Sequence, residues 1–192
     1  KIFTLLALTI SFSMNGQMDD NSQNNNSAGT WAVAMGYSTE ASGSRSTAMG
    51  SGTTASGTRS TAMGSGTTAS GSYSTAMGSG TTASGYVSTA MGYNTTASGW
   101  MSTAMGYNTT ASGEYSRAMG NGTTASDYGS LVIGQFNSSG SSATSAYLFS
   151  TSAPAFVIGN GADSSNKSDA FKVMFNGDAT VSNDLTVSGD VV

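Results

Sequence analysis

Small, apolar and polar residues recur along this chain in a pattern that repeats every fourteen residues. The clearest marker is the triplet Ala-Met-Gly, whose copies are centred on Met35, Met49, Met63, Met77, Met91, Met105 and Met119. Half a period later comes the phrase Thr-Thr-Ala-Ser-Gly, as at residues 53–57 and 67–71. A short unit copied at a fixed period is typical of one structural element stacked on its own copies.

The unit itself favours β-structure. Fourteen residues are too few for a pair of packed helices, which needs roughly 33. Glycines at 50, 52 and 57 would each cost about 0.5–1 kcal/mol inside a helix, whereas they suit tight turns. We therefore expect an all-β, parallel β-roll (solenoid) of 14-residue coils over residues 30–137. Each coil has two short strands, near 46–49 and 53–56 in one copy, and copies pair in parallel about 4.8 Å apart.

Neighbouring residues of a strand point to opposite faces, so alanine and methionine of one triplet cannot both point into the coil. One residue type lines the core and the other forms an outward stripe, which on a narrow rod indicates an interface. We expect methionine inside and alanine at the contact, because small residues allow close approach, and we expect a homotrimer. The core or interface candidates are Ala48, Met49, Ala62, Met63, Ala76, Met77, Ala90, Met91, Ala104 and Met105.

The repeat resembles the head repeat of trimeric autotransporter adhesins, the YadA-like head. The matching positions in one copy are Ser46, Ala48, Met49, Gly50, Thr53, Ala55 and Gly57. The resemblance implies a left-handed parallel β-roll, assembly of three chains into one head, adhesion to a surface ligand, and no catalysis. One departure is that the family usually has Ile or Val where this chain has Met, and Met packs less specifically.

The amino end is typical of a secretory signal peptide, predicted over 1–16. Lys1 precedes an apolar run over residues 2–10 that is too short to span a bilayer, and small residues follow it. An initiator methionine is expected to be missing. Residues 17–29 are polar and are interpreted as a linker. The sequence thus predicts a secreted protein at the cell surface or outer membrane of a bacterium, with no membrane span in this chain.

The period breaks after residue 137. Residues 138–192 contain apolar runs separated by turn signals such as Asn176-Gly177-Asp178, which predict a short β-rich segment. It resembles the neck-like segments that follow such heads in bacterial surface proteins and in tail-fibre-like proteins. Because the pattern stops at Val192 without a turn, we expect the natural protein to continue beyond it.

Composition argues against several functions. Charged residues make up 8% of the chain, the net charge is −4, and neither cysteine nor histidine is present. Thiolate metal sites and the commonest general base are therefore excluded, and arginine and lysine are too scattered for a nucleic-acid surface. The acidic residues do not converge in the sequence. We expect no enzyme activity, no cofactor and no metal.

Aromatic residues gather after the Thr-Ala-Ser-Gly phrase, where copies differ. Stacked coils would place these rings in a row that could contact sugars or apolar surfaces. The predicted ligand-binding residues are Tyr73, Tyr86, Trp100, Tyr115 and Tyr128. The partner would be a host, matrix or glycan ligand. Alternatively, the rings pack on one another and seal the edge of the rod.

A second interpretation is that the threonine residues form an ice-binding surface. Flat, weakly charged threonine ladders are what ice-binding solenoids present, although threonine also simply favours strands. The candidate ladder is Thr54, Thr68, Thr82, Thr96, Thr110 and Thr124. A third alternative is a passive spacer in a fibre-like surface protein.

Overall fold

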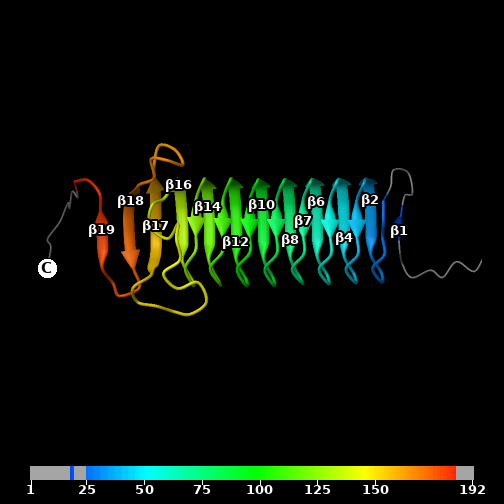
Figure 1. Cartoon of the computed structure of the whole chain (residues 1–192), viewed down its shortest axis with the longest axis horizontal. Helices are drawn as coiled ribbons and strands as arrows, with labels where there is room; N and C mark the ends of the chain where they lie inside the picture. Colours follow the sequence, from blue (N-terminus) through cyan, green and yellow to red (C-terminus); the bar gives the residue numbers. More distant parts are fainter. Residues whose placement is uncertain (1–17, 20–24, 185–192) are drawn as a thin grey trace, which may run out of the picture.

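The structure is a computed structural model that describes residues 18–19 and 25–184, and every regular element in this part is a β-strand. The strands stack side by side into a long, narrow rod (Figure 1). Within the described residues, no helix has the length and apolar character needed to cross a membrane. The predicted signal peptide, most of the predicted linker and residues 185–192 lie outside the described part.

Two sheets run along the rod. The 12-stranded sheet has the order β1-β2-β4-β6-β8-β10-β12-β14-β16-β17-β18-β19, and the 7-stranded sheet has the order β15-β13-β11-β9-β7-β5-β3. The long strands of the roll are β2 (Val33–Tyr37), β4 (Thr47–Ser51), β6 (Thr61–Ser65), β8 (Thr75–Ser79), β10 (Thr89–Tyr93), β12 (Thr103–Tyr107), β14 (Arg117–Asn121) and β16 (Leu131–Gln135). The short strands are β3 (Glu40–Ala41), β5 (Thr54–Ala55), β7 (Thr68–Ala69), β9 (Thr82–Ala83), β11 (Thr96–Ala97), β13 (Thr110–Ala111) and β15 (Thr124–Ala125). The remaining strands are β1 (Met18–Asp19), β17 (Pro154–Asn160), β18 (Asp169–Met174) and β19 (Ala179–Val181).

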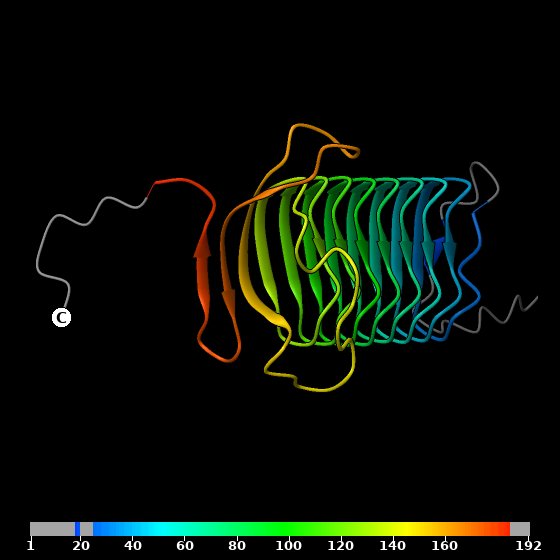
Figure 2. The ribbon, with the colours of Figure 1, turned by 60° about the vertical axis from the view of Figure 1, so that its left-hand side comes forward.

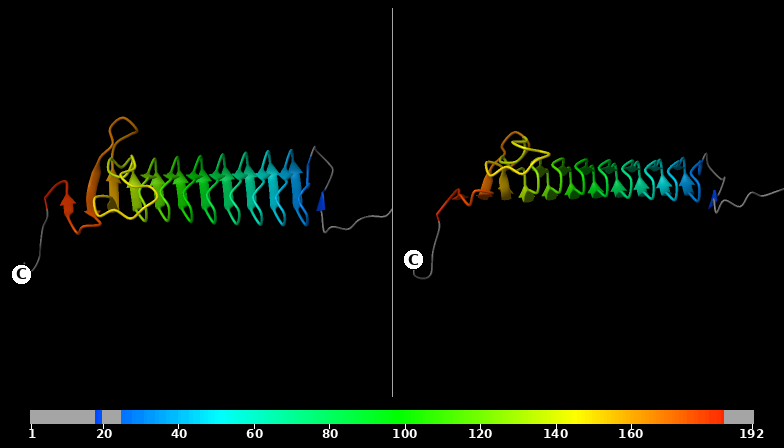
Figure 3. Two further views of the ribbon diagram at one scale, coloured as in Figure 1. Left: turned by 60° about the horizontal axis from the view of Figure 1, so that its bottom comes forward. Right: turned by 90° about the horizontal axis from the view of Figure 1, so that it is seen from below.

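Each strand of the roll pairs in parallel with its own copy one coil away. Ala48 pairs with Ala62, and Thr54 pairs with Thr68. Views from two further directions show the same alternation of a long and a short strand in each coil (Figure 3). The predicted fold class, a parallel roll of 14-residue coils with two strands each, is confirmed. The long strand begins at position 47 and reaches 51, so it is longer than expected, and the second strand is shorter.

Alanine, not methionine, fills the interior. Ala48, Ala62, Ala76, Ala90 and Ala104 are all 0% exposed, as are the alanines of the short strands, such as Ala55. Met49, Met63, Met77 and Met91 are half-buried and Met105 is 37% exposed, on the opposite side of the same strands. The expectation of methionine inside is therefore wrong. A 14-residue coil brings its two strands too close together for a long side chain on the inner face.

The interior also holds two columns of hydroxyls. Thr81, which precedes the outward Thr82, is buried, and so is Ser74 before β8. The Oγ1 atom of Thr81 and the Oγ atom of Ser74 have no hydrogen-bond partner among the described residues. Alanine, serine and threonine thus make a core of small side chains, in which the backbones of neighbouring strands set the packing.

Glycine allows the close contact between coils. Gly64, at the end of the Ala-Met-Gly triplet, has φ of 121°, and a Cβ atom built there would lie 1.9 Å from the carbonyl oxygen of Gly78 in the next coil. Gly66 also has a positive φ, of 61°, but a Cβ atom there would meet nothing within 4 Å. The first position excludes every side chain by contact. The second only disfavours a side chain through its left-handed backbone, and Asn94 and Asn108 occupy it in later coils.

The segment after the roll is built differently. A long excursion over residues 136–153 leaves the roll and returns as β17, which pairs in parallel with β16 (Figure 2). Strands β18 and β19 then add in antiparallel fashion, with register shifts between β17 and β18. The 7-stranded sheet ends at β15, so β17, β18 and β19 have no second sheet opposite them. The predicted β-rich segment is confirmed.

Two buried side chains hold the excursion against the last coil. Asp127, which stands where earlier copies have glycine, is fully buried, and its Oδ1 atom accepts hydrogen bonds from the backbone N–H groups of Thr144 (2.5 Å) and Ser145 (2.6 Å). Asn137 accepts from the N–H of Thr124 (2.8 Å) and donates to its carbonyl oxygen (2.8 Å). These two residues close the carboxyl end of the roll.

Candidate functional surfaces

The outward side of the 12-stranded sheet carries an apolar column along its length, which we call the methionine face. The methionines of β2 to β14 continue in register into Ile133 of β16 and Ile158 of β17. Phe171 of β18 pairs with Ile158, and its ring lies 6.1 Å from that of Phe156. A parallel column of Thr47, Thr61, Thr75, Thr89 and Thr103 lies beside it and ends in Arg117, Leu131 and Phe156.

Apolar character increases along the methionine face toward the carboxyl end. The neighbouring column changes from threonine through Arg117 to Leu131 and then Phe156, while methionine gives way to isoleucine. A contiguous apolar stripe of this length on a narrow rod is typical of an interaction surface. Sequence analysis identified the residues of this stripe but assigned them to the wrong side of the strand.

The aromatic corner lies where each coil turns toward its long strand, at the two residues that follow Gly57, Gly71, Gly85 and their equivalents. The second of these two residues has a left-handed backbone in coil after coil, with φ of 60° at Tyr73, 53° at Val87 and 54° at Met101. The backbone is held there by hydrogen bonds between coils, such as Met101 N–H to the Tyr86 carbonyl oxygen (2.8 Å). This conformation is unfavourable for a non-glycine residue, and most of all for a β-branched one.

The rings of the aromatic corner contact one another. Ring centroids are 5.6 Å apart for Tyr73 and Tyr86, 5.8 Å for Tyr86 and Trp100, 5.7 Å for Trp100 and Tyr115, and 5.2 Å for Tyr115 and Tyr128. Arginines extend the row: the Arg59 guanidinium lies 5.2 Å from the Tyr73 ring centroid and donates to its hydroxyl, and that of Arg45 lies 4.4 Å from the Trp31 centroid. All five predicted ligand-binding residues thus form one continuous row.

Mutual packing leaves much of this row open to solvent. Trp100 is 42% exposed and Tyr86 is 45% exposed. Most neighbouring rings meet edge to face rather than in one plane. The surface is therefore a ridged aromatic strip, in which ring edges and partial faces are available to a ligand.

The outward side of the 7-stranded sheet, which we call the threonine face, carries the predicted ladder. The six threonines, from Thr54 to Thr124, are half-buried and pair in register. Two residues further along each coil, a second column of mostly exposed hydroxyls runs beside them, formed by Ser42, Ser56, Ser70, Ser84, Ser98 and Ser112. Sequence analysis missed the serine column, although the same alternation of faces predicts it.

The acidic residues near the carboxyl end do not form a joint metal site. Asp163 accepts hydrogen bonds from the Asn166 side chain (2.9 Å) and the Ser165 N–H (2.8 Å), and these bonds hold the pKa of its exposed carboxyl below the usual value. Asp169 instead binds the N–H groups of Ser138 and Ser139. Within residues 18–19 and 25–184, no group of three metal-binding side chains comes together.

Comparison with known proteins agrees with this architecture. The family model of the YadA head domain repeat matches residues 28–53, 55–81, 83–99 and 101–116. The coils in these segments pair in 14-residue register, and the coils containing β14 and β16 continue that register beyond them. Comparison with curated proteins gives no significant match. The region from residue 28 to residue 116 is therefore a YadA-like head, of the kind that trimeric autotransporter adhesins carry.

Proposed function

We propose that this chain is a secreted, surface-exposed adhesin whose YadA-like head assembles as a homotrimer through the methionine face. The head repeats fit an adhesin-like protein of the bacterial cell surface, a structural and not an enzymatic family. The observation that carries the proposal is the unbroken apolar column from Met35 to Ile158, which a single chain leaves only half-buried on its outward face.

The assembly can be tested by placing a charge on one face at a time. Sedimentation equilibrium of the full chain should give the mass of three chains. Replacing both Met77→Glu and Met91→Glu should give a folded monomer, because a carboxylate at a desolvated contact costs several kcal/mol. The matched control is Thr68→Glu with Thr82→Glu, which puts the same charges on half-buried positions of the opposite sheet. A monomeric wild type, or equal dissociation of the control, would contradict the proposal.

Ligand binding is assigned in this proposal to the aromatic corner. Glycine would adopt the left-handed turn without strain, and Gly129 occupies the equivalent position in the last coil with φ of 67°. Earlier coils instead place Tyr73, Val87, Met101 and Tyr115 there, each at a cost of about 1–2 kcal/mol. Bulky residues retained in an unfavourable conformation indicate that their side chains are used.

The corresponding experiment compares the two edges of the rod. Tyr86→Ser with Trp100→Ser should weaken adhesion to an immobilised matrix or glycan panel about tenfold or more, because each exposed ring that stacks contributes about 1 kcal/mol or more. Tyr93→Ser with Tyr107→Ser is the control, since those rings stack on the opposite corner at 5.1 Å. Equal loss from both pairs, or from neither, would argue against the aromatic corner as the ligand site.

The threonine face supports a second function, ice binding. Its two hydroxyl columns are in register, with about 4.8 Å between coils and about 6.6 Å between columns, and carry no charge from Thr54 onward. If this face orders water, the full chain should show a gap between melting and freezing temperatures, and Thr82→Tyr with Thr96→Tyr should abolish it. A passive spacer predicts neither a freezing gap nor adhesion.

A further inference from the structure

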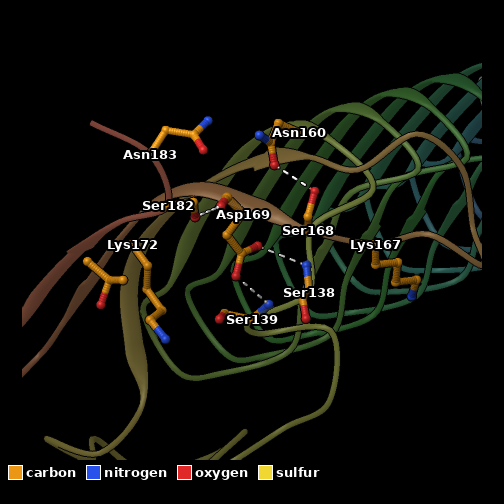
Figure 4. A pocket seen from close by; sticks show the side chains of 10 residues that line it. Ser138, Ser139, Asn160, Lys167, Ser168, Asp169, Lys172, Ser182 and Asn183 are labelled. Atoms are coloured by element: carbon orange, nitrogen blue, oxygen red, sulfur yellow. Dashed lines mark hydrogen bonds between the residues drawn. The ribbon is translucent and has the colours of Figure 1, made fainter. Parts of the chain in front are cut away.

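A polar groove lies where the roll opens into a single sheet. Among the described residues, no second sheet faces β17, β18 and β19, and residues around 138, 167 and 182 line the groove beside them (Figure 4). The groove has a volume of about 600 Å³. This size lies within the roughly 300–1,000 Å³ of typical small-molecule sites.

The groove is on the reverse of the methionine face. Lys172, which lines it, pairs with Val157 of β17, and Val157 is fully buried in the interior. Residues on either side of Lys172 belong to the other face, because successive residues of a strand alternate. A trimer built through the methionine face therefore leaves this groove accessible.

The carboxylate of the groove and two of its other acceptors are already occupied. Its only lining carboxylate, Asp169, accepts from the Ser138 N–H at Oδ1 (2.8 Å) and the Ser139 N–H at Oδ2 (2.9 Å). The Asp169 carbonyl oxygen accepts from the Ser182 hydroxyl, and the Asn160 side-chain oxygen accepts from Ser168 (2.7 Å). Figure 4 shows these hydrogen bonds as dashed lines.

The two lysine ammonium groups, in contrast, are free. Lys167 and Lys172 are the only lysines after residue 1, and both line this groove. In the described part of the chain neither ammonium group has an ion-pair or hydrogen-bond partner. Asp163, in the same loop as Lys167, is bonded to Asn166 and Ser165. Two lysines and the Asn160 amide thus line a groove whose one carboxylate is engaged by the backbone.

We infer that this groove binds a carboxylated saccharide, such as a short uronic-acid oligosaccharide. The ammonium groups of Lys167 and Lys172 would pair with carboxylates, and the serine, threonine and asparagine side chains would bind sugar hydroxyls. No aromatic side chain lines the groove, so recognition would depend on charge and hydrogen bonds and not on ring stacking. The site is separate from the aromatic corner and independent of the function proposed for it.

The test uses trigalacturonate and its methyl ester with the full chain, measured by titration calorimetry at low salt. Trigalacturonate should bind saturably, and the ester, which lacks the negative charges, should bind at least about tenfold more weakly. Lys167→Gln with Lys172→Gln should lower the affinity for trigalacturonate about tenfold or more. Arg45→Gln with Arg59→Gln removes the same two charges at the aromatic corner and should change the affinity less than about twofold.

Three results would each overturn the inference: no saturable binding of trigalacturonate, equal binding of the ester, or equal loss from the lysine and arginine pairs. The last would mean that net charge alone attracts the sugar. Tyr86→Ser with Trp100→Ser should leave trigalacturonate binding unchanged. That variant therefore separates failure of this groove from failure of the aromatic corner.

Discussion

The roll and the segment that follows it both extend one sheet, but they specify their structure in different ways. In the roll, alanine, serine and threonine fill a thin interior, and glycines let each backbone approach the next coil closely. In the segment from 138 to 184, strand pairing shifts register and the strands lack a second sheet. Buried Asp127 and Asn137 hold the connection instead. The structure of the roll is thus specified by repeated contacts between successive coils. The structure of the following segment is specified by hydrogen bonds of individual polar side chains.

The strongest way to break the roll is to place a charge in its interior. Ala76→Asp should lower the free energy of unfolding by about 4 kcal/mol or more, because the carboxylate would be buried without a partner. Thermal denaturation followed by circular dichroism measures the effect. Arg59→Ala, at the exposed corner, should change stability by less than about 0.5 kcal/mol. Equal tolerance of both substitutions would contradict the assignment of the inner face.

Contact between coils is tested next by two neighbouring glycines. Gly64→Ala should cost about 3 kcal/mol or more, because its Cβ atom would meet the Gly78 carbonyl oxygen at 1.9 Å. Gly66→Ala should cost only about 1–2 kcal/mol, the price of a left-handed backbone without a clash. Chemical denaturation of both variants gives the difference, and equal costs would mean that the coils are not packed as described.

The second region should respond to loss of its polar anchor. Asp127→Ala removes the acceptor of the Thr144 and Ser145 N–H groups and should cost about 1–3 kcal/mol. Hydrogen exchange should become faster over residues 138–153 while the amides of β4 to β10 keep their protection. Asp163→Ala, in an exposed loop, serves as control and should leave both regions unchanged. Faster exchange throughout the roll would show that the two regions are not independent.

The smallest effect is expected inside the roll and has the opposite sign. Thr81→Val replaces a buried hydroxyl that has no partner among the described residues, so it should stabilise the chain by about 1 kcal/mol. The neighbouring Thr82→Val, on the outward face, should change stability by less than about 0.5 kcal/mol. Destabilisation by Thr81→Val would indicate that the buried hydroxyl does have a partner.

The sequence predicted the roll because its period, glycines and strand alternation all agree. Alternation alone could not say whether Ala48 or Met49 points inward, since both choices satisfy a period of two. The distance between the two sheets decides this, and it is set by the corners and not by the strands. The aromatic corner was predicted as a row, whereas the contacts between Tyr86 and Trp100 depend on side-chain rotamers. The groove could not be predicted, because its walls come from segments around residues 138, 167 and 182, which only the folded chain brings together.

Residues 46–57, 60–71 and 74–85 are letter-for-letter identical. A gene that gains or loses one such copy therefore yields a rod longer or shorter by about 4.8 Å, with both ends untouched. The length of the rod can therefore change by whole coils, with no new packing problem to solve.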